Sequence, residues 1–120
     1  MFRIMSVNVL CYGRDEWFWE KRIPLVCEII RKNAPDSFGV QEAHIGWMTA
    51  LKENLPEYDY VGVGRDDGKE GGEFSAVFYK KDRFTASDSG NFWISETPDI
   101  PSKGWDAACI RIATYVKLTD

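Results

Sequence analysis

The chain has 120 residues, of which 44% are hydrophobic and 14% aromatic, so it can bury a core and is not a disordered protein. Its formal net charge of −4 excludes a general nucleic-acid coat protein, although a nuclease needs only local positive charge and a metal. No apolar run approaches the roughly 20 residues of a membrane span, and the sequence enters a strand without a signal peptide, so we expect a cytoplasmic protein without a membrane partner.

The first third of the chain predicts a strand, a helix and a second strand. Residues 2–9 alternate between two faces, with Met5, Val7 and Val9 on one of them. A helix follows, and Pro24 suggests that it begins near residue 23, with proline in its first turn. The second strand ends at Glu42. This pattern is typical of a β-helix-β unit with parallel strands.

The remaining elements change from helical to strand periodicity. A second amphipathic helix carries the apolar row Met48, Leu51 and Leu55. Beyond it, alternation and turn residues predict strands near residues 58–63, 74–79, 83–87 and 110–118. The helices are therefore concentrated in the first half, which favours an α/β fold with a mixed sheet.

Two polar residues stand at the ends of the first two strands. Ligands in open α/β sheets bind beyond the carboxyl ends of parallel strands, so Asn8 and Glu42 are expected to face one pocket. Glu42 is either a metal ligand or a cap of the helix that follows it. Asn8 either contributes an amide to the pocket or bonds to neighbouring backbone.

Three cationic or glycine-rich features leave alternatives open. Arg111 lies within the last apolar strand, where it needs a partner, either an acid such as Asp106 or a bound phosphate. Arg65 is a weaker candidate of the same kind. The loop 65–72 is either a mobile hairpin connection or the rim of a site.

The cysteines and the histidine do not suggest a nucleophile. Cys11, Cys27 and Cys109 are widely spaced and are expected to be free thiols. His44 is the only histidine and is expected in the first turn of the second helix rather than as a base. Trp93 and Trp105 are able to stack on a base or sugar, but tryptophans more often belong to the core.

The polar positions and their surroundings form a set of short motifs. This set resembles the amino-terminal half of an endonuclease/exonuclease/phosphatase family hydrolase. The residues that carry the resemblance are Ser6-Val7-Asn8, Gln41-Glu42, Gly62 to Gly68, Ser75 to Tyr79, and Gly104 to Ala108 followed by Arg111-Ile112-Ala113.

The resemblance implies roles for individual residues. Glu42 binds a divalent cation, Mg²⁺ or alternatively Mn²⁺, with Asn8 beside it as a metal-proximal amide that orients the phosphate or water. Arg111 and Arg65 contact the substrate phosphate. Glu73 aligns with the glutamate that braces a catalytic histidine in secreted deoxyribonucleases, and that histidine lies in the other half of the domain.

The resemblance also implies a fold and its incompleteness. Residues 1–120 form the amino-terminal half of a four-layer α/β sandwich, with a mixed, mostly antiparallel sheet and helices on one face. The motifs Asn-Thr-His, Gly-Asp-x-Asn and Ser-Asp-His are missing from this sequence. The chain alone is therefore expected to be inactive, and to associate with itself through the apolar sheet face that a second half would cover.

These expectations define two functions. The first is a metal-dependent phosphoesterase of nuclease or phosphatase type. Its partners are a phosphate-ester substrate, with nucleic acid as one candidate, and a carboxy-terminal half of the domain. The alternative is a truncated, non-catalytic family member that acts as a binding or self-associating module.

Overall fold

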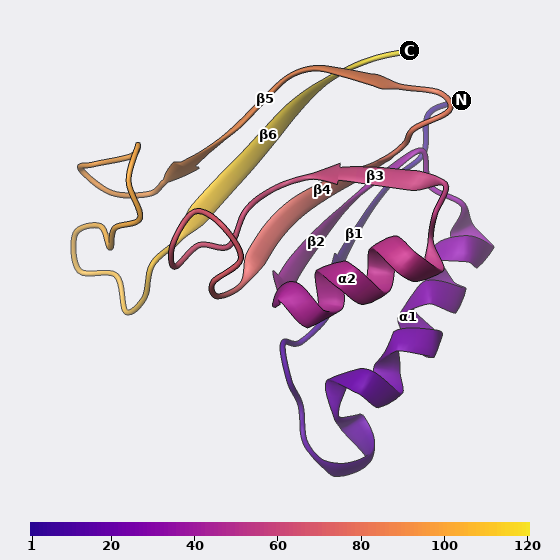
Figure 1. Ribbon diagram of the computed structural model, residues 1–120, viewed down its shortest axis with the longest axis horizontal. Coiled ribbons are helices and arrows are strands. Elements are labelled where there is room, and N and C mark those ends of the chain that lie inside the picture. Colours follow the sequence, from indigo (N-terminus) through magenta and orange to yellow (C-terminus); the bar gives the residue numbers. More distant parts are fainter.

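The computed structural model describes all residues 1–120 as three layers (Figure 1). Helices α1 (Trp19–Asn33) and α2 (Ile45–Asn54) cover one face of a four-stranded sheet with strand order β1-β2-β4-β3. Its strands are β1 (Ile4–Asn8), β2 (Ser37–Ala43), β3 (Tyr58–Val61) and β4 (Phe74–Lys80). On the other side, β5 (Thr85–Trp93) and β6 (Ile112–Thr119) form a two-stranded antiparallel sheet. A short 3-10 helix, η1 (Asp15–Trp17), precedes α1.

The sheet topology brings the candidate residues together. Strands β1 and β2 are parallel and joined by α1, whereas β4 pairs antiparallel with both β2 and β3. Parallel strands end at the same edge of a sheet, so Asn8 is paired with Gln41, next to Glu42. The predicted α/β class, with a mixed sheet and helices on one face, is confirmed.

The core lies between the helices and the four-stranded sheet. Met48, Leu51 and Leu55 are fully buried, as predicted for the apolar row of α2. Val9 belongs to this core and Met5 and Val7 pack against it, which confirms the predicted alternation of the first strand. Neither helix has the length and apolar character that crossing a membrane requires.

The predicted start of α1 is wrong. The helix begins at Trp19, so Pro24 lies inside it rather than in its first turn. Proline lacks the N–H that would bond to the carbonyl of Glu20, and this loss destabilises a helix. Trp19 and Ile23 both pack against the core, and this contact holds the extra turn in helical conformation.

The fifth predicted strand is too short. The structure extends it from residue 85 to residue 93, through a polar stretch with little β-propensity. Pairing with β6 continues along this whole length, from Thr85 opposite Thr119 to Trp93 opposite Ile112. Long-range pairing therefore overrides the local sequence preference.

The second face of the four-stranded sheet is more polar than we expected. Between this face and β6 lies a groove of about 530 Å³. Apolar side chains line it, among them Ile4, Val77 and Leu118, but Ser6 and Gly39 also contribute. The face is thus only in part the apolar surface that we expected a second half to cover.

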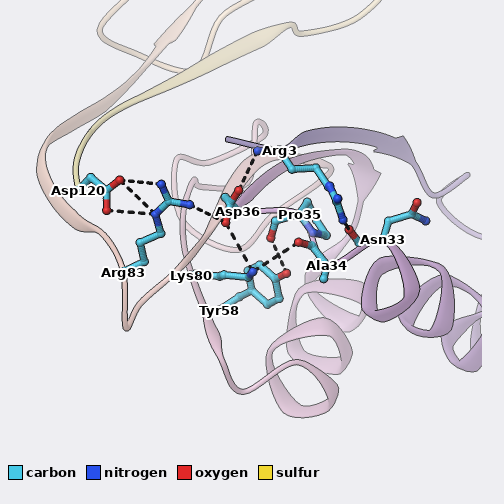
Figure 2. A network of polar contacts seen from close by, with 9 residues as sticks. All are labelled: Arg3, Asn33, Ala34, Pro35, Asp36, Tyr58, Lys80, Arg83 and Asp120. Atoms are coloured by element: carbon cyan, nitrogen blue, oxygen red, sulfur yellow. Dashed lines mark hydrogen bonds and ion pairs between the residues drawn. The ribbon is translucent and has the colours of Figure 1, made fainter. Parts of the chain in front are cut away.

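A polar network joins the strand ends at the edge of the sheet that lies away from Asn8 and Glu42 (Figure 2). The Asp36 carboxylate accepts a hydrogen bond from the Arg3 backbone N–H at 2.7 Å and pairs with Arg83 at 2.9 Å and Lys80 at 3.5 Å. Arg83 also forms a bidentate pair with both carboxylate oxygens of Asp120. One aspartate therefore joins the start of β1 to the end of β4 and, through Arg83, to the end of β6.

We expect replacement of Asp36 by asparagine to lower the thermal midpoint at pH 7. The Arg3 N–H and the Arg83 guanidinium hold the pKa of Asp36 below its usual range. A lowered folded-state pKa stabilises the protein above the unfolded-state pKa, about 3.9, and this stability is lost as the pH falls through the folded-state pKa. Thermal melts at pH 7, 5 and 3 should therefore show a difference between wild type and Asp36→Asn that shrinks at pH 3. Asp88→Asn, an exposed position on β5 without an ion pair, is the control, and a constant difference across this range would contradict the assignment.

Candidate functional site

All five predicted site residues line one cavity, which we call the Glu42 pocket. It has a volume of about 250 Å³ and lies where β1 and β2 end, beside the β3–β4 loop and the start of β6. Gln41 and Ser75 add polar groups that sequence reasoning did not assign a role. The complete lining is Asn8, Gln41, Glu42, Arg65, Glu73, Ser75, Arg111 and Ile112.

Glu42 lies in a distorted part of β2. The pairing of β2 with β4 shifts register between Val40 and Ala43, and Glu42 has a φ of +59°, in the left-handed region. A bulge of this kind redirects a side chain out of the regular alternation of a strand. For a residue other than glycine, this conformation costs about 1–3 kcal/mol and is concentrated at functional sites.

The alternative role of Glu42 as a helix cap is wrong. The N-cap of α2 is His44, whose Nδ1 accepts a hydrogen bond from the Gly46 N–H at 3.0 Å. This confirms the placement of His44 at the start of α2. Glu42 is thereby left without a structural hydrogen bond to the helix that follows it.

The Asn8 side chain bonds to neighbouring backbone, which was one of its two predicted roles, and it also lines the cavity. Its Oδ1 accepts a hydrogen bond from the Leu10 N–H at 3.0 Å. An amide oxygen has two lone pairs and the amide nitrogen two donors. One acceptor position and both donors of Asn8 therefore remain for a ligand in the pocket.

Arg65 and Glu73 form an ion pair that the sequence did not predict. Arg65 Nη2 lies 3.0 Å from Glu73 Oε2, and both side chains are largely shielded from solvent. Trp93 is buried, as expected for a core residue, whereas Trp105 is exposed, contrary to that expectation. The Trp93 indole donates a hydrogen bond to the Arg65 carbonyl at 2.7 Å. Both charged groups are thus held in place at one wall of the pocket.

Arg111 does not lie inside a strand, contrary to prediction. It directly precedes β6 and is exposed, so no large desolvation cost arises. It forms no ion pair with Asp106 or with any other acid. The structural alternative is therefore wrong, and the guanidinium in the pocket is available to an anion.

The glycine-rich loop between β3 and β4 rims the cavity. Asp67 Oδ1 accepts hydrogen bonds from the N–H groups of Gly71 at 2.9 Å and Lys69 at 2.7 Å, and these bonds lower the pKa of Asp67. Gly64 also donates to the Lys69 carbonyl. The loop has a defined internal hydrogen-bond pattern that sets the position of Arg65.

Neither the histidine nor the nearby cysteine is prepared for acid-base or nucleophilic chemistry. Burial lowers the pKa of His44, so the ring is neutral at pH 7. Since Nδ1 accepts a hydrogen bond, the proton is on Nε2, and neither nitrogen is free to take another. Burial, and then the charge of Glu73, raise the pKa of the Cys11 thiol. All three cysteines are free, as expected.

One positioning residue escaped sequence reasoning. The Arg22 guanidinium donates to the carbonyls of Val9, Leu10, Tyr12 and Trp17, and thereby holds the segment that connects β1 with α1. Its guanidinium carbon lies 5.3 Å from the centre of the Trp47 ring. No sequence motif marks an arginine that binds backbone carbonyls of the segment preceding its own helix.

The donor set of the Glu42 pocket suits a hard cation and a phosphate. The Glu42 carboxylate and the spare lone pair of Asn8 Oδ1 are oxygen ligands of the kind that Mg²⁺ prefers. The structure contains no group of three or more His, Cys, Asp or Glu side chains able to hold a metal. Water and substrate oxygens would therefore complete the coordination of any ion bound here.

The comparisons with known proteins point to one family. A structure of an endonuclease/exonuclease/phosphatase family protein from Bacteroides thetaiotaomicron is similar with a TM-score of 0.93 and 41% identity, over 98% of this chain and 43% of that one. A mannosyl-6-phosphatase of the same species is also 41% identical, with a TM-score of 0.94, over 98% of this chain and 46% of the other. Uncharacterized protein L388 of Acanthamoeba polyphaga mimivirus is 31% identical over 91 residues, or 72% of this chain and 34% of that protein. No protein-family model matches the chain.

The chain thus has the fold of the endonuclease/exonuclease/phosphatase family, which confirms the resemblance predicted from the sequence. It spans less than half the length of the solved structures that it matches, and about a third of the viral protein. One half of the family's domain is therefore represented in these 120 residues.

Proposed function

We propose that this chain supplies the amino-terminal half of a metal-dependent phosphoesterase site. The observation that carries the proposal is the convergence of Glu42, Asn8, Arg65 and Arg111 on one cavity of about 250 Å³. An oxygen donor set beside two guanidinium groups is what a cation and a phosphate require together. The similar mannosyl-6-phosphatase supports the same class of reaction.

Each residue has a distinct task in this proposal. Glu42 and Asn8 hold Mg²⁺, or Mn²⁺, which when bound polarises a phosphoryl oxygen. Arg111 binds a phosphate oxygen pair with its planar guanidinium, and its freedom from any ion pair leaves all its donors available. Arg65, held by Glu73, contributes a second positive charge from the other wall.

The remaining chemistry comes from outside these residues. No histidine lines the Glu42 pocket, and the only histidine of the chain is occupied as a helix cap. A general base and further metal ligands would come from a second half, so these 120 residues alone should not turn over substrate. In the same proposal Glu73 braces a histidine of that second half through Oε1, while Oε2 keeps its bond with Arg65.

A second candidate function is binding without catalysis. No histidine that could act as a general base lines the Glu42 pocket. If the chain acts without a second half, this favours binding over catalysis. Such a module would bind phosphate through Arg111 and Arg65, and would associate with itself through the groove beside β6. Hydrolysis after addition of a second half separates the two functions, since a pure binding module would remain inactive.

The metal site can be tested on the chain itself. We expect Mn²⁺ to bind weakly, with a dissociation constant on the order of 10⁻³ M, because one carboxylate and one amide leave most of an octahedral shell to water. Glu42→Gln should weaken binding about tenfold or more. Paramagnetic broadening of amide NMR signals measures both values, and the control is Glu28→Gln, an exposed carboxylate on α1. Equal binding by wild type and Glu42→Gln would remove Glu42 from the proposal.

A further inference from the structure

A second cavity adjoins the Glu42 pocket, and we call it the Tyr12 pocket. It has a volume of about 330 Å³ and is lined by Cys11, Tyr12, His44, Ile45, Arg65, Asp66, Glu70, Gly72 and Glu73. Arg65 and Glu73 belong to both cavities, so their ion pair forms the shared wall. A molecule with its phosphate in the Glu42 pocket therefore has room for its remaining part in the Tyr12 pocket.

The charges of the Tyr12 pocket select against an anion. Asp66, Glu70 and Glu73 are acidic, and Arg65 is the only cation among the lining residues. Asp66 approaches Arg65 only at 4.0 Å, and Glu70 has no hydrogen bond or ion pair. A second phosphate, as in a nucleic-acid backbone, would meet uncompensated carboxylates, and such like-charge contacts act against a wrong ligand.

The free carboxylates suit a ligand rich in hydroxyl groups. An ionised carboxylate only accepts hydrogen bonds, so Asp66 and Glu70 need donors such as sugar hydroxyls. A quaternary ammonium group would also suit carboxylates, so phosphocholine is included as a competing probe in the test below. A neutral polyhydroxy group satisfies both signs of charge at once.

An aromatic platform stands at one side of the pocket. The Tyr12 ring is stacked on His44, with centroids 4.5 Å apart and planes at 17°, and 57% of the residue remains exposed. His44 packs edge-on against Trp19 at 4.5 Å, and Trp19 contacts the fully buried Trp47. This column connects an exposed ring to the core, so the ring is held in a fixed orientation.

The backbone of the platform is fixed as well. Arg22 donates to the Tyr12 carbonyl at 3.1 Å, and the Trp47 indole donates to the Cys11 carbonyl at 2.9 Å. A rigid, exposed aromatic ring loses little conformational freedom when it contacts a ligand. The ring face opposite His44 is suited to the apolar C–H face of a sugar ring, while the carboxylates would bind the hydroxyl edge.

We propose that the Tyr12 pocket binds the organic part of the substrate and that this part is a neutral sugar, so that the substrate class is sugar phosphomonoesters rather than nucleic acid. The proposal rests on the proposed function, because it needs the phosphate to occupy the Glu42 pocket. The cavity is at the lower end of the about 300–1,000 Å³ typical of small-molecule sites, which fits one sugar unit.

Titrations of the full 120-residue chain in the presence of Mg²⁺ test this proposal. The probes are inorganic phosphate, mannose 6-phosphate, phosphocholine and a deoxydinucleotide, each followed by NMR chemical shifts. We expect mannose 6-phosphate to bind about fivefold more tightly than inorganic phosphate, given the usual contribution of one aromatic contact. Tyr12→Ala and Glu70→Gln should remove this advantage and leave the binding of inorganic phosphate unchanged.

Two matched variants control for nonspecific effects. Tyr115→Ala removes an exposed tyrosine of β6, and Glu96→Gln an exposed carboxylate, and neither residue lines the Tyr12 pocket. Both should behave as wild type with every probe. A loss of the sugar advantage in these controls as well would overturn the assignment to Tyr12 and Glu70.

The outcomes separate the two proposals. If inorganic phosphate binds and Arg111→Ala weakens it, but mannose 6-phosphate gains nothing from Tyr12, the sugar proposal is overturned and the proposed function stands. Tighter binding of phosphocholine or the dinucleotide than of mannose 6-phosphate also overturns the sugar proposal. If no phosphate compound binds, or Arg111→Ala changes nothing, both proposals fail together.

Discussion

Replacement of Arg111 by alanine is expected to slow phosphate-ester hydrolysis on the order of a hundredfold or more, once the chain is completed by a second half. The reason is the loss of a charge-assisted contact that is strongest in the transition state, and single groups of this kind contribute about that much. Arg111 is exposed and free of any ion pair, so its removal leaves no buried partner unsatisfied. The effect should therefore appear in the rate and not in stability.

The measurement uses this chain combined with a carboxy-terminal half that carries the Asp-x-Asn and Asp-His motifs. Metal-dependent phosphate release should appear on combination and should be absent from either half alone. Arg111→Lys should recover little, because an ammonium group cannot replace a bidentate guanidinium. Glu42→Gln should also abolish the restored activity.

A matched control is available for the arginine. Arg14 is exposed, and its side chain makes no ion pair and lines neither pocket, so Arg14→Ala should keep the full rate. Equal rates for wild type and Arg111→Ala, with both chains folded, would remove Arg111 from the site. A combined protein that folds but remains inactive would instead favour the binding module.

The largest stability effect is expected at the centre of the sheet. Phe78 on β4 is fully buried, stacked on Phe38 with ring centroids 4.6 Å apart and planes at 5°, and 5.1 Å from Tyr60. Phe78→Ala should lower the free energy of unfolding by about 3–5 kcal/mol. Domains of this size are stable by only about 5–15 kcal/mol, so much of the total would be lost.

Urea denaturation followed by circular dichroism measures this loss. Phe92→Ala on β5 is the control, because 45% of Phe92 is exposed and its removal leaves no closed cavity. The control should lose about 1 kcal/mol or less. Similar losses for both variants would show that the core is not centred on the four-stranded sheet as described.

The sequence predicts the features of the fold that depend on local residue periodicity. The alternation around Met5 and Val7 and the row Met48, Leu51 and Leu55 follow from periodicity alone, and both are found in the structure. The convergence of Asn8 and Glu42 needed one further rule, that parallel strands end at a common edge. These features depend on neighbours in the chain or on general topology.

The features that the sequence did not predict depend on contacts between residues that lie apart in the chain. The extension of β5 comes from β6, and the Arg65–Glu73 pair from the closure of a loop around Asp67. The four carbonyls bound by Arg22 belong to a segment whose path no local signal predicts. The apolar neighbours of Arg111 predict that it lies within a strand, yet the pairing of β6 begins one residue later.

The left-handed backbone conformation of Glu42 means that the residue best suited to the fold differs from the residue that the proposed site requires. Glycine adopts a φ of +59° without strain, so a sequence selected for folding alone would favour glycine in this bulge. Glycine would relieve the conformational cost and remove the carboxylate from the pocket. In the proposed function, the carboxylate of residue 42 is needed in the pocket, and glutamate therefore stands there at the expense of the fold. Laboratory selection for thermostability without an activity screen would accordingly be expected to lose this residue early.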